Sequence, residues 1–270
     1  MAKMLWKPSV ERVRESNMYR FMQAVNAKHG LSLDGYAALH AWSVDHIPEF
    51  WGALWEHLGI THSVGYREVV DDPGRMPGAR WFSGARLNFA ENLLRYRDAR
   101  TALVFKGEGL PSTRLTYAHL YDETARIASA LRAMGVRPGD RVVGFMPNMP
   151  QTIIAMLAAT SIGAVWSSCS PDFGIKGVLD RFGQIRPKVV FTADGYRFKG
   201  KPIDSIERTA NVLKELDSVE RVVVVPYISA APDIGKIPKA VLWAEFRSAD
   251  AGLQIVFEQL PFDHPLYIMY

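Results

Sequence analysis

The chain has 270 residues, of which 48% are hydrophobic, so it can build a substantial core and is not a disordered polypeptide. The 32 basic and 28 acidic residues are spread along it and give a net charge of +4, which excludes a basic tail or a nucleic-acid-binding stripe. A single cysteine excludes an internal disulfide, and no apolar run is long enough to span a bilayer, so we expect a cytoplasmic protein without membrane or nucleic-acid partners.

Residues 1–100 differ from the rest, because they contain most of the tryptophans and no strong strand pattern. Ser16 is placed to cap a helix that Gly30 ends, and Pro48 suits the first turn of another helix with an aromatic stripe. Residues 66–92 are rich in Gly, Pro and Arg, which predicts an extended arm across a surface. The sequence therefore predicts a helical N-terminal extension and surface arm over residues 1–100.

Residues 101–106 and 113–115 predict two strands around a glycine-containing turn. The GxG in this turn is not a dinucleotide fingerprint, because it leads into a second strand rather than into a helix. Thr116 is placed to cap the next helix, which Gly135 ends.

Residues 140–194 predict a β-α-β-α-β unit. Short apolar runs at 142–146, 164–168 and 189–192 alternate with two segments of helical periodicity, the first opened by Pro150. Strands joined by helices of this length lie parallel, and ligands of such sheets bind beside the carboxyl ends of the strands. We therefore predict an α/β fold with parallel β-α-β layers over residues 101–270 and look for chemistry in the loops 146–150, 168–173 and 193–201.

The remainder predicts a helix over about 203–216, an apolar strand at 221–225, a Pro-rich connector and a final strand pattern at the end of the chain. No turn or polar tail follows this last pattern, which favours a natural protein that continues beyond it. A sheet face that lacks its covering elements would expose apolar surface, so we expect self-association.

No catalytic residue or metal ligand is predicted. Ser83 lacks the G-x-S-x-G elbow, Cys169 is best interpreted as a small apolar filler at a strand end, and the histidines have no metal-binding spacing. The basic loop after the third strand is the remaining signal. Its Arg197, Lys199 and Lys201 could converge on a phosphate beside an aromatic ring, although an ordinary solvated loop is the competing interpretation.

One stretch resembles a known family: LTYAHLYDETARIASALRAMGVRPGDRVVGFMPNMPQTIIAMLAATSIGAVWSSCSPDFG is similar to the N-terminal domain of the acyl-adenylate-forming acyl-CoA synthetases. The upstream LHAWSVDHIPEFWGALWEHLGI and GARWFSGARLNFAENLL resemble the extension of acetyl-CoA synthetase relatives, and the combination is most similar to the members that activate acetoacetate.

The resemblance implies an acid-thiol ligase that uses ATP, Mg²⁺ and CoA, with acetoacetate as the acid and acetate or propionate as alternatives. Such an enzyme converts the acid to an acyl-adenylate with release of pyrophosphate, and the CoA thiol then displaces AMP. The family's phosphate loop would begin just after residues 266–270, so the resemblance implies a chain that is truncated before the ATP site and is itself inactive.

For site residues, the resemblance implies only part of a CoA site. Arg197 matches an arginine that lies near the 3′-phosphate and adenine of CoA, and Lys199 or Lys201 stands where a second basic residue is expected. Ser170 and Pro171 align with an aromatic-glycine pair that lines the same site; Pro171 departs from that pattern and has no backbone donor.

Two other classes remain open. A non-catalytic module that only docks CoA or a partner chain would lack a Ser/Thr/Gly-rich run ending in Lys after this stretch of the gene. A nicotinamide oxidoreductase would fit the α/β pattern, but no G-x-G-x-x-G here leads from a strand into a helix.

Overall fold

The computed structural model describes residues 4–270. The chain divides into two compact units, the first of residues 1–86 with 261–263 and the second of residues 87–260 with 264–270. The short strands β3 (Arg86–Leu87) and β13 (Leu260–Pro261) each contain a boundary between the units.

The described part of the first unit is mainly helical, as predicted. Its helices are α1 (Val10–Arg14), α2 (Asn17–His29), α3 (Tyr36–Asp45) and α4 (Ile47–Leu58). The Ser16 hydroxyl caps α2 by accepting from the Tyr19 N–H at 3.1 Å, and Gly30 ends that helix with a φ of 64°. Aromatic and aliphatic side chains from α2, α3 and α4 form a small core, among them Phe21, Trp42 and Ala53.

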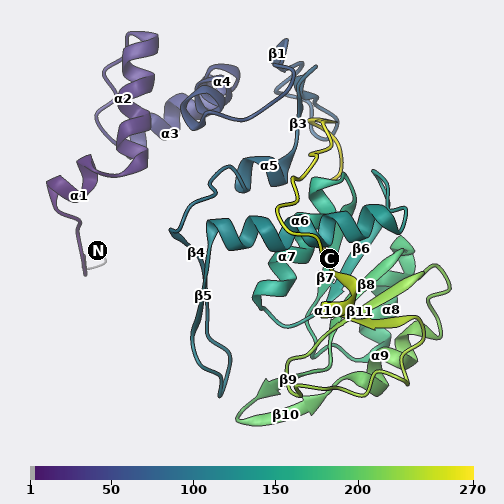
Figure 1. Ribbon diagram of the computed structural model, residues 1–270. Helices are drawn as coiled ribbons and strands as arrows, with labels where there is room; N and C mark the ends of the chain where they lie inside the picture. The colour runs from purple at the N-terminus through teal and green to yellow at the C-terminus, as the bar shows by residue number, and fades with distance from the viewer. Residues whose placement is uncertain (1–3) are drawn as a thin grey trace. The chain divides into compact units, whose positions relative to one another are not determined.

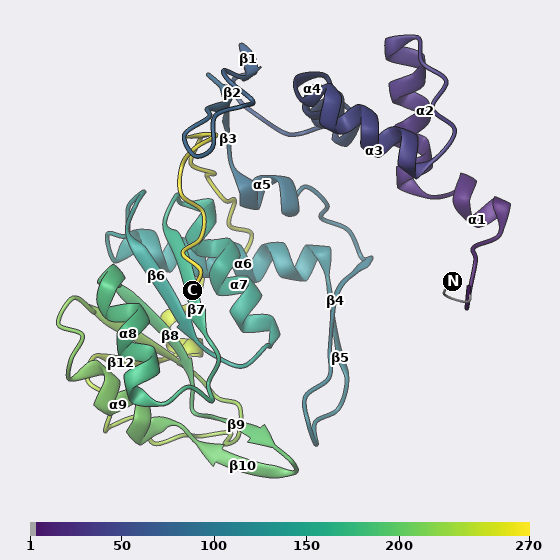
Figure 2. The same cartoon turned by 180° about the vertical axis from the view of Figure 1, so that it is seen from behind.

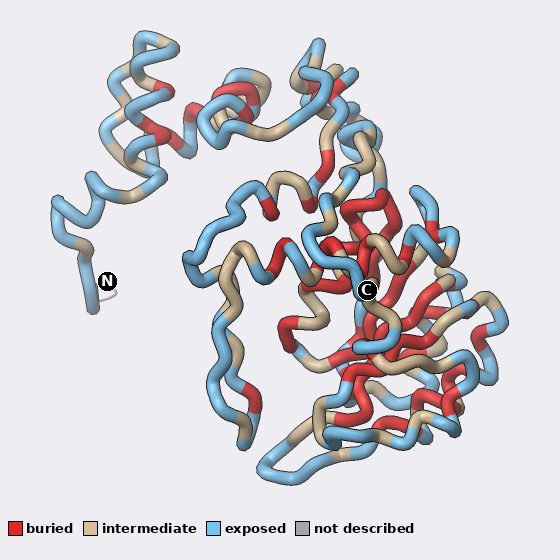
Figure 3. The backbone as a smooth tube through the Cα atoms, viewed as in Figure 1, coloured by how far each residue is buried: buried red, intermediate tan, exposed pale blue. Residues whose placement is uncertain are grey.

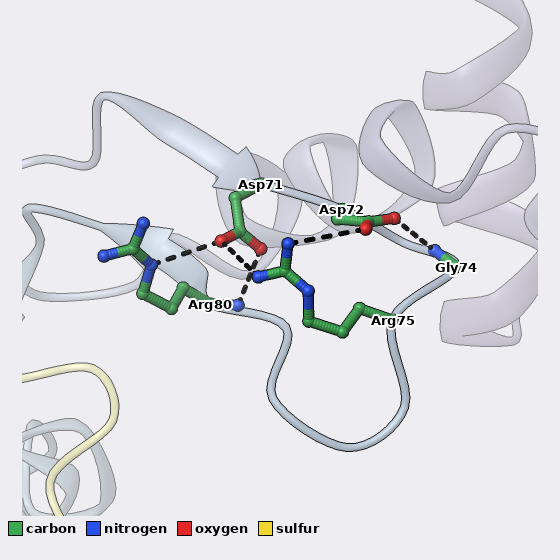
Figure 4. Close-up of polar contacts among 5 residues, drawn as sticks. All are labelled: Asp71, Asp72, Gly74, Arg75 and Arg80. Carbon is green, nitrogen blue, oxygen red and sulfur yellow. Dashed lines mark hydrogen bonds and ion pairs between the residues drawn. The ribbon is translucent and has the colours of Figure 1, made fainter.

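The arm predicted over residues 66–92 is only partly extended. It contains the antiparallel strands β1 (Glu68–Val70) and β2 (Trp81–Ser83), and helix α5 (Phe89–Leu93) begins near its end. Asp71 closes the loop between the strands: its carboxylate accepts from the backbone N–H of Arg80 at 2.8 Å and from the Arg80 guanidinium at 3.2 Å (Figure 4). The backbone donor holds the pKa of Asp71 below its usual value. Asp71 is thus a turn residue.

The second unit contains a five-stranded parallel sheet in the order β12-β11-β8-β6-β7, four of whose strands, β6, β7, β8 and β11, are labelled in Figure 1. Its strands are β6 (Arg141–Phe145), β7 (Val165–Cys169), β8 (Val189–Ala193), β11 (Arg221–Val225) and β12 (Ala240–Leu242). The predicted β-α-β-α-β unit is therefore confirmed.

Helices cover both faces of this sheet (Figure 2). They are α6 (Tyr117–Ala133), α7 (Pro150–Ser161), α8 (Ile175–Ile185), α9 (Ile206–Leu213) and the short α10 (Trp243–Phe246). In β11, Val223 and Val225 join the core on the α6 and α7 side, while Val222 and Val224 join the core with α8 and α9. Both faces are apolar, which explains the unbroken aliphatic runs and the buried strands in Figure 3.

A buried asparagine ties distant segments of the second unit together. The Asn88 side-chain amide donates to the carbonyls of Thr160, Ser161 and Glu258 at 3.1, 3.1 and 2.9 Å, and its oxygen caps α5 by accepting from the Glu91 N–H. These carbonyls lie at the end of α7 and in the returning chain, so Asn88 fixes α5 against both.

Within the described residues, the predicted final strand forms a single bridge, from Tyr267 to Trp166 of β7 in the parallel sense. The Trp166 N–H donates to the Leu266 carbonyl at 3.0 Å, and the Ile268 N–H donates to the Trp166 carbonyl at 2.9 Å. The segment therefore lies along β7 without completing a sixth regular strand.

Candidate functional site

The carboxyl edge of the parallel sheet gathers the loops after β7, β8 and β11. The loop predicted over residues 193–201 is not a loop: it forms a β-hairpin of β9 (Gly195–Phe198) and β10 (Lys201–Asp204), labelled in Figure 1. Lys199 and Gly200 form its two-residue turn and have φ angles of 49° and 77°. Tight hairpin turns of type I′ require positive φ at both central residues, and Gly200 meets this requirement without steric cost. The second strand also delays the next helix, which begins at Ile206 rather than near residue 203.

The hairpin separates the basic residues that the sequence placed together. Residues paired across two antiparallel strands share a face, and neighbours along a strand alternate between faces. Phe198 pairs with Lys201, whereas Arg197 pairs with Pro202. The Lys199 ammonium lies 5.4 Å from the centre of the Phe198 ring. Phe198, Lys199 and Lys201 therefore occupy one face of the hairpin, and Arg197 lies on the other.

Arg197 is half-buried and incompletely hydrogen-bonded. Its Nε is buried without a hydrogen-bond partner, and no carboxylate among residues 4–270 lies within ion-pair distance of its guanidinium. Burial of a guanidinium donor without an acceptor is costly, and native proteins satisfy nearly all such groups. Arg197 is therefore suited to receive an anion at the carboxyl edge of β8.

Tyr227 lies close to Arg197 and follows β11. Burial raises the pKa of its hydroxyl, while the nearby positive charge of Arg197 opposes that rise and the negative charge of Glu108 adds to it.

The backbone around Tyr227 is held by Asp194, a buried residue at the end of β8. Its Oδ1 accepts from the N–H groups of Tyr227 and Ile228 at 2.7 and 3.0 Å, and its Oδ2 accepts from Ser229 at 2.9 Å.

These bonds make Asp194 a structural link between two strand ends. No sequence motif around Asp194 points to this role. The only local signal was an acidic residue directly after a largely apolar strand, and the three donors that it binds are more than 30 residues away in the chain.

Ser170 and Pro171 lie in the loop after β7, as predicted. Ser170 is exposed, whereas Pro171 is buried and its carbonyl accepts from Nη1 of Arg208 at 2.7 Å. Pro171 also lacks an N–H, so its backbone has no donor to offer a ligand. Arg208 lies on α9, which follows the β9–β10 hairpin, and therefore connects the hairpin segment to the β7 loop. No pattern in the sequence distinguished Arg208 from an ordinary helical arginine.

The basic residues after β8 and the pair Ser170 and Pro171 after β7 follow strands that end at the same edge of the sheet. These two strands are not neighbours, because β6 lies between them. Neighbouring strands are about 4.8 Å apart, so the carboxyl ends of β8 and β7 are roughly 10 Å apart. A ligand that touched residues at both strand ends would have to span about this distance.

Cys169 ends β7 and is buried. Burial raises the pKa of its thiol to about 11, against a smaller opposing effect of Arg181. Because the nucleophile is the thiolate, a thiol with such a pKa is almost entirely unreactive at neutral pH. The interpretation of Cys169 as a small apolar filler agrees with this environment.

A cavity of about 420 Å³ lies between the β4–β5 hairpin (β4, Thr101–Phe105; β5, Thr113–Thr116), the start of α7 and the loop after β11. Aromatic and apolar side chains dominate its lining, among them Phe105, Tyr227 and Trp243.

Within residues 4–270, no group of three or more His, Cys, Asp or Glu side chains is arranged to hold a metal ion. In the same range, no helix has the length and apolar character needed to cross a membrane.

Two family models match this chain, one in its amino-terminal part and one in the remainder. The family model for AMP-binding enzymes matches residues 89–270, and the model for the acetyl-coenzyme A synthetase N-terminus matches residues 36–93. The resemblance drawn from the sequence is therefore confirmed.

The similar individual proteins are CoA synthetases. The chain is 45% identical to the acetoacetyl-CoA synthetase of Danio rerio, over all of this chain and 41% of the relative. It is also 45% identical to the acetoacetyl-coenzyme A synthetase of Rhizobium meliloti (strain 1021), over 98% of this chain and 41% of the relative. Identity to the malonamoyl-CoA synthetase of Penicillium aethiopicum is 37%, over 98% of this chain and 38% of that protein.

A solved structure shows the same fold. The acetoacetyl-CoA synthetase from Streptomyces lividans superimposes with a TM-score of 0.90 at 43% identity, covering 100% of this chain and 41% of that one. The chain thus spans about 41% of the length of the acetoacetyl-CoA synthetases it matches.

Proposed function

The chain belongs to the AMP-binding enzyme family, and from this premise we propose that it is the amino-terminal part of a ligase that joins acetoacetate to CoA. The higher identity to acetoacetyl-CoA synthetases than to the malonamoyl-CoA synthetase supports acetoacetate as the acid. Acetate and propionate are the alternative acids.

The proposed reaction has two steps, because a carboxylate does not react with a thiol until its oxygen becomes part of a good leaving group. The acid first attacks the α-phosphate of ATP, which gives an acyl-adenylate and pyrophosphate. The CoA thiol then displaces AMP. Mg²⁺ enters the proposal only as the counter-ion of ATP, and we assign none of residues 4–270 to hold it. A cytoplasmic location, which a single cysteine supports, is part of the same proposal.

In this proposal, residues 4–270 contribute part of the CoA site and no catalytic group. The Arg197 guanidinium binds a phosphate at the nucleotide end of CoA, and the observation that carries this role is its buried Nε without a partner. Ser170 lies in the loop after β7 on the same edge of the sheet, and Pro171 shapes that loop through its carbonyl contact with Arg208. Lys199 and Lys201 attract the anion from the opposite face of the hairpin rather than sharing its contact with Arg197.

Arg197→Gln tests this role directly. We expect the dissociation constant of adenosine 3′,5′-bisphosphate, the nucleotide end of CoA, to rise by about tenfold or more, because a charge-assisted hydrogen bond is lost. Isothermal titration of the chain measures this change. Arg137→Gln is the matched control for charge, because Arg137 is an exposed arginine that precedes β6, at the amino end of the strands.

The full-length gene product gives the second measurement. Arg197→Gln should raise the KM for CoA and leave acetoacetate-dependent exchange between ATP and pyrophosphate nearly unchanged, since exchange does not involve CoA. Equal losses in both assays, or equal binding losses in the Arg137 control, would count against the assignment of Arg197.

A further inference from the structure

The turn between β4 and β5 contacts the turn of the β9–β10 hairpin. Oε1 of Glu108 accepts from the backbone N–H of Gly200 at 2.5 Å. Glu108 is exposed, and its neighbour Gly109 has a φ of 68°, a backbone conformation that glycine adopts without steric cost. A carboxylate from a distant segment thus occupies the backbone donor at the tip of the basic hairpin.

Glu108 also lies in the surroundings of Arg197. A methyl group built on Gly109 would lie 3.8 Å from Nη1 of Arg197, and the charges of Glu108 and Arg197 act in opposite directions on the same Tyr227 hydroxyl. Even so, among the described residues the two side chains do not form an ion pair. The carboxylate takes the Gly200 donor and leaves the buried Nε of Arg197 unpaired.

These groups form a donor set for an anion. The hairpin tip offers the Gly200 N–H, and Arg197 offers a guanidinium from the side that faces the β4–β5 turn. A phosphate oxygen makes the same kind of contact with a backbone N–H as the Glu108 carboxylate makes here. A phosphate has more oxygens than a carboxylate, so it could satisfy both Gly200 and Arg197.

We propose that Glu108 is an internal competitor for the phosphate-binding position at this hairpin, and that the Gly200 N–H becomes a phosphate ligand once Glu108 withdraws. This inference rests on the proposed function, because the competing phosphate belongs to the nucleotide end of CoA. The carboxylate and the phosphate are both negative, so they repel each other at this distance and cannot share one donor. Binding therefore includes displacement of the β4–β5 turn from the hairpin.

Removal of the carboxylate should tighten phosphate binding. We expect Glu108→Ala to lower the dissociation constant of adenosine 3′,5′-bisphosphate by about threefold to tenfold, since one competing charged hydrogen bond is lost. Glu108→Gln should give a smaller gain in the same direction, because its amide oxygen still accepts from Gly200 but carries no charge. Adenosine, which has no phosphate, should bind both variants as it binds the unchanged chain.

Glu215→Gln is the matched control for net charge. Glu215 is exposed just beyond α9 and its substitution changes the net charge by the same amount as Glu108→Gln. The dissociation constant of adenosine 3′,5′-bisphosphate for Glu215→Gln should stay within about twofold of that for the unchanged chain, because screened charges at a distance contribute little. An equal gain in Glu215→Gln would show a general charge effect and overturn the competitor role.

The outcomes separate this inference from the proposed function. If the unchanged chain binds the bisphosphate through Arg197 but Glu108→Ala binds no more tightly, the competitor role is wrong and the CoA site stands. If neither the unchanged chain nor Glu108→Ala binds it, or if Arg197→Gln has no effect, the CoA site is wrong and the competitor role falls with it.

Discussion

Strand β8 and the β9–β10 hairpin follow each other directly in the chain but differ in almost every physical respect. All five residues of β8 are buried, and the strand is paired on both sides. Among residues 4–270, the strands of the hairpin pair only with each other, and Arg197 keeps a buried donor without a partner; the hairpin turn is exposed. The strand therefore contributes stability, while the hairpin retains unsatisfied polar groups that a ligand can satisfy.

The largest predicted difference between the strand and the hairpin is in the free energy of unfolding when a phenylalanine in each is replaced by alanine. The Phe191 side chain in β8 is fully buried, with its ring centre 5.8 Å from that of Trp243, so Phe191→Ala should lower the free energy of unfolding by about 3–5 kcal/mol. Phe198 in the hairpin is 56% exposed, and Phe198→Ala should cost about 1 kcal/mol or less.

The free energy of unfolding of both variants is measured by urea titration, with hydrogen exchange of the β8 peptide as the readout. That peptide reports on the second unit alone. Similar losses for the two variants would contradict the separation between a stabilising strand and a ligand-binding hairpin.

A second, intermediate effect concerns Cys169 at the end of β7. With its pKa raised from 9.0 to about 11, the thiolate fraction at pH 8 should be about a hundredfold lower than that of an ordinary thiol. A disulfide reagent such as DTNB should therefore react at least that much more slowly with the folded chain than with the same chain in denaturant. The rate should rise as the pH approaches 11, because the folded thiol ionises only there. Equal rates in the two states would show that the strand end is open to solvent.

The smallest effect is expected for Lys201. Because Lys201 lies on the face of the hairpin opposite Arg197, Lys201→Gln should weaken binding of adenosine 3′,5′-bisphosphate by no more than about twofold. The loss should also disappear as the ionic strength increases, since only long-range attraction is removed. A tenfold loss, equal to that expected for Arg197→Gln, would mean that both residues reach the same phosphate and that the hairpin rearranges on binding.

Local patterns predicted most of the second unit correctly. The runs at 142–146, 189–192 and 221–225 correspond to β6, β8 and β11, and the starts of α6 and α7 follow Thr116 and Pro150. Each of these signals acts within a few residues: an apolar run buries both faces of a strand, a threonine hydroxyl satisfies a free N–H, and a proline fixes φ at a helix start.

The candidate site was predicted less completely. The position of Arg197 at a strand end followed from the sequence, but the hairpin did not, because Lys-Gly is a weaker signal for a two-residue turn than Asn-Gly or Asp-Gly. Without the hairpin, the alternation that separates Arg197 from Lys201 could not be foreseen. Arg208 was missed because its partner, the Pro171 carbonyl, is 37 residues away.

The sequence by itself determined the fold class, the family and the strands and helices of the sheet, since hydrophobic periodicity and capping are local properties. Only the tertiary structure decided the strand order β12-β11-β8-β6-β7, the links made by Asn88 and Asp194, and the contact between Glu108 and Gly200. These features join segments many residues apart. Their free energies depend on burial and hydrogen bonding between those segments, which no single stretch of the chain contains.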